Sequence, residues 1–409
     1  MVDVSMTDPI VDNAVAGGGG GGPGLTMAFG GGGPGSMMPG GGILAGAPAG
    51  GIGGAPPAGG PRIVVLTRTQ ILYSDTSGAT WVASTGLPVG ATHRAIVNDT
   101  INNRIFAFMQ VPVADMRCYV STDRGASFAL AGGINNAAVF PVGVTFEPAT
   151  PRMVPAGAPN AGRLLYPWQD NAPPFARQYV SRSDDGAGTW NTTQLVPTFG
   201  VPAVATAVPP VAITPNGNVY SFAHDAPGRV RNMRSLDQGV TFTDIGNAFG
   251  FIGANWMWPL PTNNLLCFNS AATRLYRGTD MGAFVLWAQV LLATAGSPAI
   301  LSDGALSCLL GLFRTGPNQL DLYSSGDVGA TWVGPFQTIG LGGSPGPAND
   351  RAPWLDAIGT FNWLVSYDDL TGVGAPWTVY QNNVLGAGFA QLGASLAAGS
   401  TRILQTITV

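Results

Sequence analysis

An eight-residue phrase occurs three times along the 409-residue chain, at long intervals. It reads STDRGASF from residue 121, SLDQGVTF from residue 235 and SGDVGATW from residue 325. The shared pattern is Ser-x-Asp-x-Gly-x-Ser/Thr-aromatic, and weaker copies end at Trp81, Trp190, Phe284 and Phe389. A phrase that returns at intervals of this size indicates one structural unit used repeatedly, so the chain is restricted to repeat architectures.

Each phrase has the residues of a tight turn between two strands. Ser and Asp side chains accept hydrogen bonds from nearby backbone amides, Gly adopts a positive φ without a Cβ clash, and the aromatic residue re-enters a strand as a core side chain. A calcium loop would need more carboxylates than the single one that each phrase offers, so no metal site is predicted. The residues expected to build these structural turns are Ser121, Asp123, Gly125, Phe128, Ser235, Asp237, Gly239, Phe242, Ser325, Asp327, Gly329 and Trp332.

Short apolar runs bounded by Gly, Pro, Asn and Asp lie between the phrases. Such runs are typical of strands, and about four of them in a unit of about 50 residues predict a β-propeller blade. Seven phrases predict an all-β, seven-bladed propeller over residues 62–409. The first unit is one strand short, and the terminal run RILQTITV has no unit of its own. We therefore expect residues 402–409 to pair into the first blade and close the ring.

The repeated phrase resembles the Asp-box, or bacterial neuraminidase repeat, of sialidase-like β-propellers. Three copies match its pattern fully and four match in part, and the resemblance covers about residues 62–409. Related propellers include glycosidases, receptor ectodomains, assembly factors and virion proteins. The resemblance therefore implies a fold and leaves the function to be argued from other residues.

A sialidase-like hydrolase requires an arginine cluster, a Tyr nucleophile with a Glu partner and an Asp acid. The sequence offers Arg62-Ile63-Val64 without the family's Pro, a lone Glu147 followed by Arg152, and two Asp pairs in turn-like sequence, Asp184–Asp185 and Asp368–Asp369. The only histidines, His93 and His224, are far apart. No convincing catalytic set emerges, and no cofactor is predicted, so a hydrolase is the alternative rather than the leading interpretation.

The charged residues are unusual in kind. All 18 basic residues are Arg, and 21 of the 22 acidic residues are Asp. Scarcity of Lys and Glu, which are strong helix formers, agrees with an all-β chain; a high-GC genome and a surface packed within an assembly both account for it. The net charge of −4 without a basic patch argues against nucleic-acid binding.

The cysteines and the absence of targeting segments bear on the state of the thiols and on location. Cys118, Cys267 and Cys308 lie in expected strands without a CxxC pair, which predicts buried free thiols. The N-terminal residues show no secretion signal, and no segment has membrane-spanning quality, so we expect synthesis in a host cytoplasm and no membrane insertion.

Residues 1–61 precede the propeller and are rich in Gly and Pro; from residue 17 to residue 60, 22 of 44 residues are Gly. This composition is typical of a flexible linker. Apolar residues interrupt it at intervals, which favours an attachment arm whose side chains enter pockets of partner proteins. These residues are Leu25, Met27, Phe29, Met37, Met38, Ile43, Leu44 and Ile52.

We therefore expect a non-enzymatic structural or binding protein, a bacteriophage or other virion component that decorates a head or tail. Its partners would be other virion or assembly proteins, bound through residues 1–60. Host-surface glycans are a second candidate partner, because Trp256, Trp258, Trp354 and Trp363 are expected in loops of the ring's face, where aromatic rings stack on sugars. A sialidase-like hydrolase and an intracellular Asp-box assembly factor are the alternatives.

Overall fold

The structure is a computed structural model of the chain. It describes residues 62–67, 69–76, 78, 80–111, 115–134, 151–170, 177–195, 210–224, 230–249, 255–269, 274–292, 296–302, 307–314, 319–340, 354–357, 363–368, 377–382, 390–391 and 403–409. Within these ranges the chain forms strands, turns and no helix. Residues 1–61, with the expected attachment arm, lie outside the described residues, as do Glu147, Asp369 and Phe389.

The described strands form seven four-stranded antiparallel sheets, which are numbered here in chain order. Sheet 1 contains β28 (Ile403–Thr408), β1 (Ile63–Thr67), β2 (Ile71–Ser74) and β3 (Val82–Ala83). Sheet 2 contains β4 (Thr92–Asp99), β5 (Arg104–Val111), β6 (Asp115–Ser121) and β7 (Ala129–Gly133). Sheet 3 contains β8 (Arg152–Met153), β9 (Leu164–Asp170), β10 (Arg177–Ser183) and β11 (Asn191–Gln194).

The remaining sheets follow the same order. Sheet 4 contains β12 (Val211–Ile213), β13 (Val219–His224), β14 (Val230–Ser235) and β15 (Thr243–Phe249). Sheet 5 contains β16 (Asn255–Pro259), β17 (Leu265–Asn269), β18 (Arg274–Asp280) and β19 (Val285–Leu292). Sheet 6 contains β20 (Gly296–Ser302), β21 (Cys308–Arg314), β22 (Gln319–Ser325) and β23 (Val333–Gly340). Sheet 7 contains β24 (Trp354–Ala357), β25 (Trp363–Asp368), β26 (Trp377–Asn382) and β27 (Ala390–Gln391).

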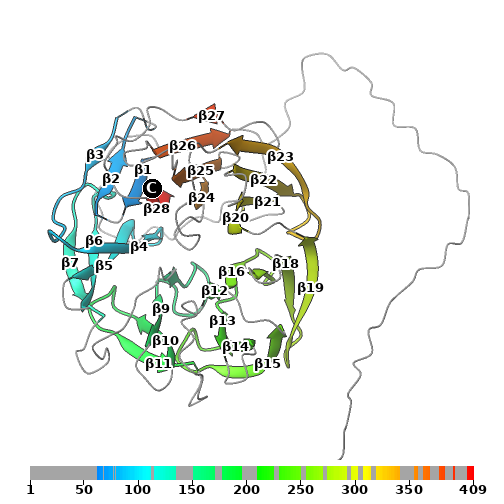
Figure 1. Cartoon of the computed structure of the whole chain (residues 1–409). Helices are drawn as coiled ribbons and strands as arrows, with labels where there is room; N and C mark the ends of the chain where they lie inside the picture. The colour runs from blue at the N-terminus through cyan, green and yellow to red at the C-terminus, as the bar shows by residue number, and fades with distance from the viewer. Residues whose placement is uncertain are drawn as a thin grey trace, which may run out of the picture. The chain divides into compact units, whose positions relative to one another are not determined.

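The sheets are arranged around a ring, with one end strand of each sheet toward the centre and the other at the outer margin (Figure 1). Each sheet follows the chain from the inner strand outward, except that β28 supplies the inner strand of sheet 1. This arrangement confirms the all-β propeller expected from the repeats. The repeated phrases fall at equivalent places, between the third and the outermost strand of a sheet.

The core lies between successive sheets, and the burial of the second strand of a sheet on both faces shows this. In β5 five consecutive residues are buried, because this strand is covered on both faces. Ile105 packs in the same cluster as Val64 of sheet 1, whereas Phe106 packs in a cluster with Tyr166 of sheet 3. Alternate side chains of one strand therefore fill two different inter-sheet cores. Apolar runs such as RIFAFMQV are the sequence signature of this double burial.

The two ends of the described ring meet in sheet 1. β28 pairs antiparallel with β1, and the register places Ile63 opposite Thr408. Beyond the strand ends, the Arg62 amide donates to the Val409 carbonyl and the Val409 amide donates to the Arg62 carbonyl, both at 3.0 Å. This is the pairing expected of residues 402–409, and it leaves the inner edge of β1 covered.

The three cysteines are buried free thiols, as the sequence predicts. Cys118 lies in β6, Cys267 in β17 and Cys308 in β21, each with no exposed surface. Burial disfavours the thiolate and raises the pKa of Cys118 and Cys267 above the ordinary value. These thiols act as small core side chains.

Candidate functional site

The repeated turns are the best-defined polar feature of the described residues. Four of them, at 121–128, 183–190, 235–242 and 325–332, share one hydrogen-bond pattern and are called the regular turns. In each, the Ser hydroxyl accepts a hydrogen bond at 2.7–2.9 Å from the amide four residues ahead. The same hydroxyl donates to Oδ1 of the Asp at 2.6–2.8 Å. The Ser therefore ties the start of the turn to both its centre and its carboxylate.

The Asp carboxylate closes the second half of each regular turn. Oδ1 accepts a hydrogen bond from the amide of the Ser or Thr four residues ahead, at 2.8–2.9 Å. Oδ2 accepts one from the hydroxyl of that same residue, at 2.5–2.7 Å. The carboxylates concerned belong to Asp123, Asp185, Asp237 and Asp327. Both oxygens of each thus bind the residue four places ahead, Oδ1 through its amide and Oδ2 through its hydroxyl.

These hydrogen bonds favour the ionised carboxylate. At Asp327 the hydrogen bonds from the Thr331 hydroxyl and amide lower the pKa to about 2. At Asp185 the Thr189 amide is the main cause of a lowered pKa. Burial opposes ionisation at Asp123, yet the hydrogen bonds from Ser127 and Ser121 outweigh it, and the pKa is again lowered. The turn carboxylates are therefore charged at neutral pH and serve as hydrogen-bond acceptors.

The glycine of the phrase has a backbone reason. Gly239 has a φ of +90°, and a Cβ there would stand 2.9 Å from Leu165 of the preceding sheet. The residue before it, Gln238, also has a positive φ. In the regular turn at 183–190 the glycine comes one place earlier, at Gly186. Ala187 takes the glycine's usual place and has a left-handed backbone with a φ of 76°. This one-residue displacement of the glycine therefore leaves the hydrogen-bond pattern unchanged.

Arginines of one sheet reach the turn of the next sheet. Arg62 Nη1 donates to the carbonyls of Asp123 and Arg124, at 2.9 and 3.1 Å. Arg163 Nη1 donates in the same way to the carbonyls of Asp237 and Gln238, at 2.8 and 3.0 Å. Arg277 Nε donates to the Val328 carbonyl at 3.2 Å. The regular turns at 121–128, 235–242 and 325–332 thus bind a guanidinium from the preceding sheet as well as their own side chains.

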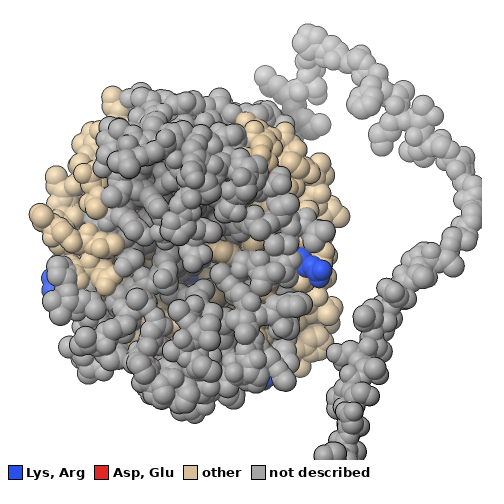
Figure 2. Space-filling view, in the orientation of Figure 1, with Lys and Arg blue, Asp and Glu red and all other residues tan. Residues whose placement is uncertain are grey.

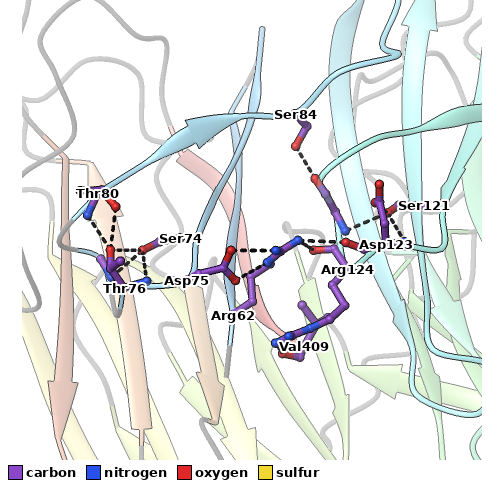
Figure 3. Close-up of polar contacts among 12 residues, drawn as sticks. Arg62, Ser74, Asp75, Thr76, Thr80, Ser84, Ser121, Asp123, Arg124 and Val409 are labelled. Atoms are coloured by element: carbon purple, nitrogen blue, oxygen red, sulfur yellow. Dashed lines mark hydrogen bonds and ion pairs between the residues drawn. The ribbon is translucent and has the colours of Figure 1, made fainter. Parts of the chain in front are cut away.

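The Arg62 contacts also join the two ends of the ring (Figure 3). Arg62 forms a bidentate ion pair with Asp75, at 2.6 and 2.7 Å, which lowers the pKa of that carboxyl. Its guanidinium lies 4.3 Å from the centre of the Tyr73 ring. Arg124 Nη2 donates to the Val409 carbonyl at 2.7 Å. Sheet 1, the turn of sheet 2 and the end of β28 are therefore held by one polar cluster.

The turn of sheet 5 departs from the pattern. Gly278 replaces the Ser, and a Cβ there would lie 2.6 Å from the Trp287 ring. Asp280 accepts hydrogen bonds from the Tyr220 hydroxyl at 2.5 Å and from Arg234 Nη1 at 2.9 Å, both in sheet 4. Within its own turn it accepts the Gly282 amide at 2.8 Å. Here the carboxylate ties two sheets together in addition to its one hydrogen bond within the turn.

Ionisation in this cluster is coupled. Burial opposes the charge on Asp280, but the contacts with Tyr220, Gly282 and Arg234 outweigh it and lower the pKa of the carboxyl. Burial and the nearby carboxylate raise the pKa of Tyr220. Tyr220 therefore stays protonated and donates its hydrogen bond. Sequence reasoning missed this cluster, because Tyr220 and Arg234 lie in strands of sheet 4, far in sequence from Asp280, and meet it only in the ring.

The residues considered for a hydrolase are separated in the structure. Arg62 lies in the polar cluster at the ring closure, and Arg163 pairs with Asp184. Arg152 begins the inner strand β8, where burial lowers its pKa to about 10 and Nε donates to the Val211 carbonyl at 3.4 Å. Asp185 closes a regular turn. His93, His224 and Asp368 lie in strands β4, β13 and β25, and their side chains are outside the described part of the structure.

The tryptophans proposed for sugar stacking are in strands, which corrects the expectation of loops. Trp256 and Trp258 lie two residues apart on the inner strand β16, and both are half-buried against the core cluster between sheets 5 and 6. Trp354 begins β24 and Trp363 begins β25. Residues two apart in a strand share one face, and on β16 that face packs against the next sheet. Among the turn aromatics, Phe128 is buried, and Phe242 and Trp332 pack half-buried against their cores.

Figure 2 shows few charged atoms among the described residues of the face turned to the viewer. Its visible described atoms are mostly uncharged, basic atoms show chiefly at the margin, and no acidic atoms are seen among them. Within the described residues, no three His, Cys, Asp or Glu side chains are grouped closely enough to hold a metal ion. The same residues include no helix that is long and apolar enough to span a membrane.

Neither a protein-family model nor a curated protein sequence matches the chain. Solved structures share its fold. A candidate 6-phosphogluconolactonase from Bacteroides uniformis is 12% identical over 85% of this chain and 99% of that chain, with a TM-score of 0.56. A second candidate 6-phosphogluconolactonase, from Bacteroides fragilis, is 11% identical over 85% of this chain and 98% of that chain, with a TM-score of 0.55. The lectin BP39L from Burkholderia pseudomallei is 14% identical over 84% and 94%, with a TM-score of 0.53. At this identity the likeness establishes the propeller fold alone.

Proposed function

We propose that the chain is a non-enzymatic binding or structural protein, a virion component of the Asp-box propeller type that residues 1–61 attach to other virion or assembly proteins. One observation carries the non-enzymatic part. The carboxylates of the regular turns and of Asp280 are engaged by backbone amides, hydroxyls and guanidiniums that hold the sheets. Groups engaged in this way stabilise a scaffold, and an active site needs acids and bases that face a substrate.

Composition supports the attachment part. The chain has no Lys and a single Glu, which leaves its surface poor in the charges that usually keep a free protein soluble. The N-terminal residues combine abundant Gly with spaced apolar side chains, and Gly permits the close approach of partner backbone. A protein held within a particle satisfies both features.

The proposal is tested by incorporation of the full-length chain into particles. Met27→Asp and Phe29→Asp place charges in the expected attachment arm, and Ala28→Ser between them is the matched control. We expect both Asp variants to lose incorporation while their thermal unfolding matches that of the unchanged chain. Undiminished incorporation of both variants would contradict the attachment role.

The hydrolase alternative is tested in the same preparations. A sialoside substrate is offered to the unchanged chain and to Glu147→Gln, which removes the only Glu. We expect no turnover from either protein. Turnover that disappears with Glu147→Gln would replace the proposal with a glycoside hydrolase. Retained binding on a glycan array without turnover would add glycans to the partners.

A further inference from the structure

Among the described strands, each sheet ends in an outer strand that pairs on one side only. Such an edge presents free backbone donors and acceptors, and natural proteins protect it with short length, charge, proline or irregular backbone. The outer strands are β3, β7, β11, β15, β19, β23 and β27. Comparison of these strands shows that one of them, β19, is the least protected.

Six outer strands are protected in a recognisable way. β3 and β27 have two residues each, and β11 is a four-residue polar strand. β7 contains two glycines among five residues, which weakens pairing. β15 carries Asp244, which is paired with Arg231 of the adjacent strand. β23 is eight residues long, but Pro335 removes a backbone donor near its start.

β19 has only one of these features, a bulge near its far end. Its sequence VLWAQVLL contains no charge, proline or glycine across eight residues. The register with β18 is regular from Val285 to Gln289, and a bulge follows. Leu286 is 55% exposed, and Ala288 and Gln289 are also exposed. Figure 1 shows β19 at the outer margin of the ring, and among the described strands only β18 pairs with it.

Exposed apolar side chains gather at the same hairpin. Nine large apolar residues are exposed among the described ones, and three of them, Met281, Phe284 and Leu286, fall within six residues of sequence. This is the hairpin of the divergent fifth turn. A long uncharged edge beside a local apolar patch is the combination that pairs with another strand.

We propose that β19 of one copy pairs antiparallel with β19 of a second copy, and that the chain forms a two-fold dimer through this edge. An edge without charge meets its own copy without like-charge repulsion. Antiparallel pairing of two identical strands is self-complementary about a two-fold axis, so the contact closes and does not propagate. Centred on Trp287, the pairing places Leu286 of each copy opposite Ala288 of the other. The dimer does not depend on residues 1–61 or on the proposed virion role.

Charges introduced at Leu286 and Ala288 test this register directly. In the Leu286→Lys/Ala288→Lys variant, two pairs of lysines face each other across the interface; Leu286→Glu/Ala288→Glu does the same with acids. Both side chains are exposed, so folding within one copy is expected to be unaffected. Light scattering at about 10–100 µM, a range suited to a small interface, should show a dimer for the unchanged chain and a monomer for each variant. An equimolar mixture of the two variants should recover the dimer.

Leu130→Lys is the matched control, because Leu130 is 56% exposed on the protected outer strand β7. It should leave the dimer intact. Hydrogen exchange of peptide 285–292 should slow with rising concentration in the unchanged chain and should not in the lysine variant. A monomeric unchanged chain, a dimer that survives the lysine variant, or a mixture that stays monomeric would each overturn the proposal. Loss of the dimer with Met27→Asp would also overturn it and would assign the edge to the N-terminal arm.

Discussion

The regular turns and the fifth turn occupy equivalent places in their sheets and use their Asp in different ways. In the regular turns the carboxylate bonds within the phrase, to the Ser before it and the Ser or Thr after it. Asp237 also accepts the Val240 amide of its own phrase. In the fifth turn Gly278 and Phe284 stand where those hydroxyl-bearing residues would be. Asp280 is bonded instead to Tyr220 and Arg234 of sheet 4. One turn position therefore either closes a local loop or joins two sheets.

The difference predicts how costly each Asp is to remove. Asp327 is exposed, so water can hydrate the Thr331 amide and hydroxyl when the carboxylate is lost. The side chains of Arg234 and Asp280 are only 14% and 17% exposed, and Tyr220 is 2% exposed. Loss of Asp280 would leave a guanidinium and a phenol with little access to water. An unpaired buried polar group costs far more than an exposed one.

Asp280→Ala should have the largest effect of the substitutions considered. We expect it to lower the free energy of unfolding by about 3 kcal/mol, the lower part of the range for breaking a buried pair. Urea denaturation followed by tryptophan fluorescence measures it. A loss below about 1 kcal/mol would place Asp280 with the regular turns and remove the distinction.

Gly278→Ala should rank second, because the new methyl group meets the Trp287 ring. A Cβ at Gly278 would lie 2.6 Å from that ring, and overpacking of this kind costs about 1–3 kcal/mol. Gly326→Ala is the matched control, since a Cβ there has no neighbour within 4 Å. The control should unfold at nearly the urea concentration of the unchanged chain. Equal stability of the two variants would show that the Trp287 ring is not held over Gly278.

Asp327→Ala should cost about 1 kcal/mol, the usual net contribution of an exposed set of hydrogen bonds. The same denaturation series measures it, and Thr331→Val serves as the partner variant because it keeps the amide and removes the hydroxyl. The Thr331 variant should lose less than the Asp327 variant. The reverse order would mean that the hydroxyl, and not the carboxylate, closes the turn.

The smallest expected effect is the pH dependence of the stability difference between the unchanged chain and Asp327→Ala. The pKa of Asp327 is lowered to about 2 in the folded chain, whereas an unfolded Asp titrates near 3.9. A lowered folded pKa stabilises the protein above the unfolded pKa, and this stabilisation is lost as the pH falls from about 4 to about 2. The gap between the unchanged chain and Asp327→Ala should therefore narrow over that window. A gap that is constant from pH 5 to pH 2 would contradict a structural role for the ionised carboxylate.

The sequence alone predicts the features that depend on residues close together in the chain. The Ser, Asp and Gly of a phrase lie within five residues of one another, so their roles follow from turn chemistry. The strand that closes the ring was also foreseeable, because sheet 1 lacked one strand and 402–409 had no partner. The cysteines followed from their apolar runs.

The contacts between sheets could not be read in advance. Arg62 meets Arg124, and Arg234 meets Asp280, only because the ring brings successive sheets together. A partial signal exists, since Arg62, Arg104 and Arg163 each stand before an apolar pair near the start of a second strand. The expectation of loops for Trp256 and Trp258 fails for the same reason, because their apolar partners lie on the next sheet and are not visible in a local window of sequence.

The central claim is that the carboxylates of these turns stabilise the folded propeller. In the turn of sheet 5, the carboxylate of Asp280 does so by joining two sheets. The most direct test is a double-mutant cycle on Arg234→Ala and Asp280→Ala, with Arg234→Ala and Asp327→Ala as the reference pair. We predict a coupling free energy of about 1.5 kcal/mol or more for the first pair and less than about 0.5 kcal/mol for the second. Equal, near-zero coupling in both cycles would contradict the account.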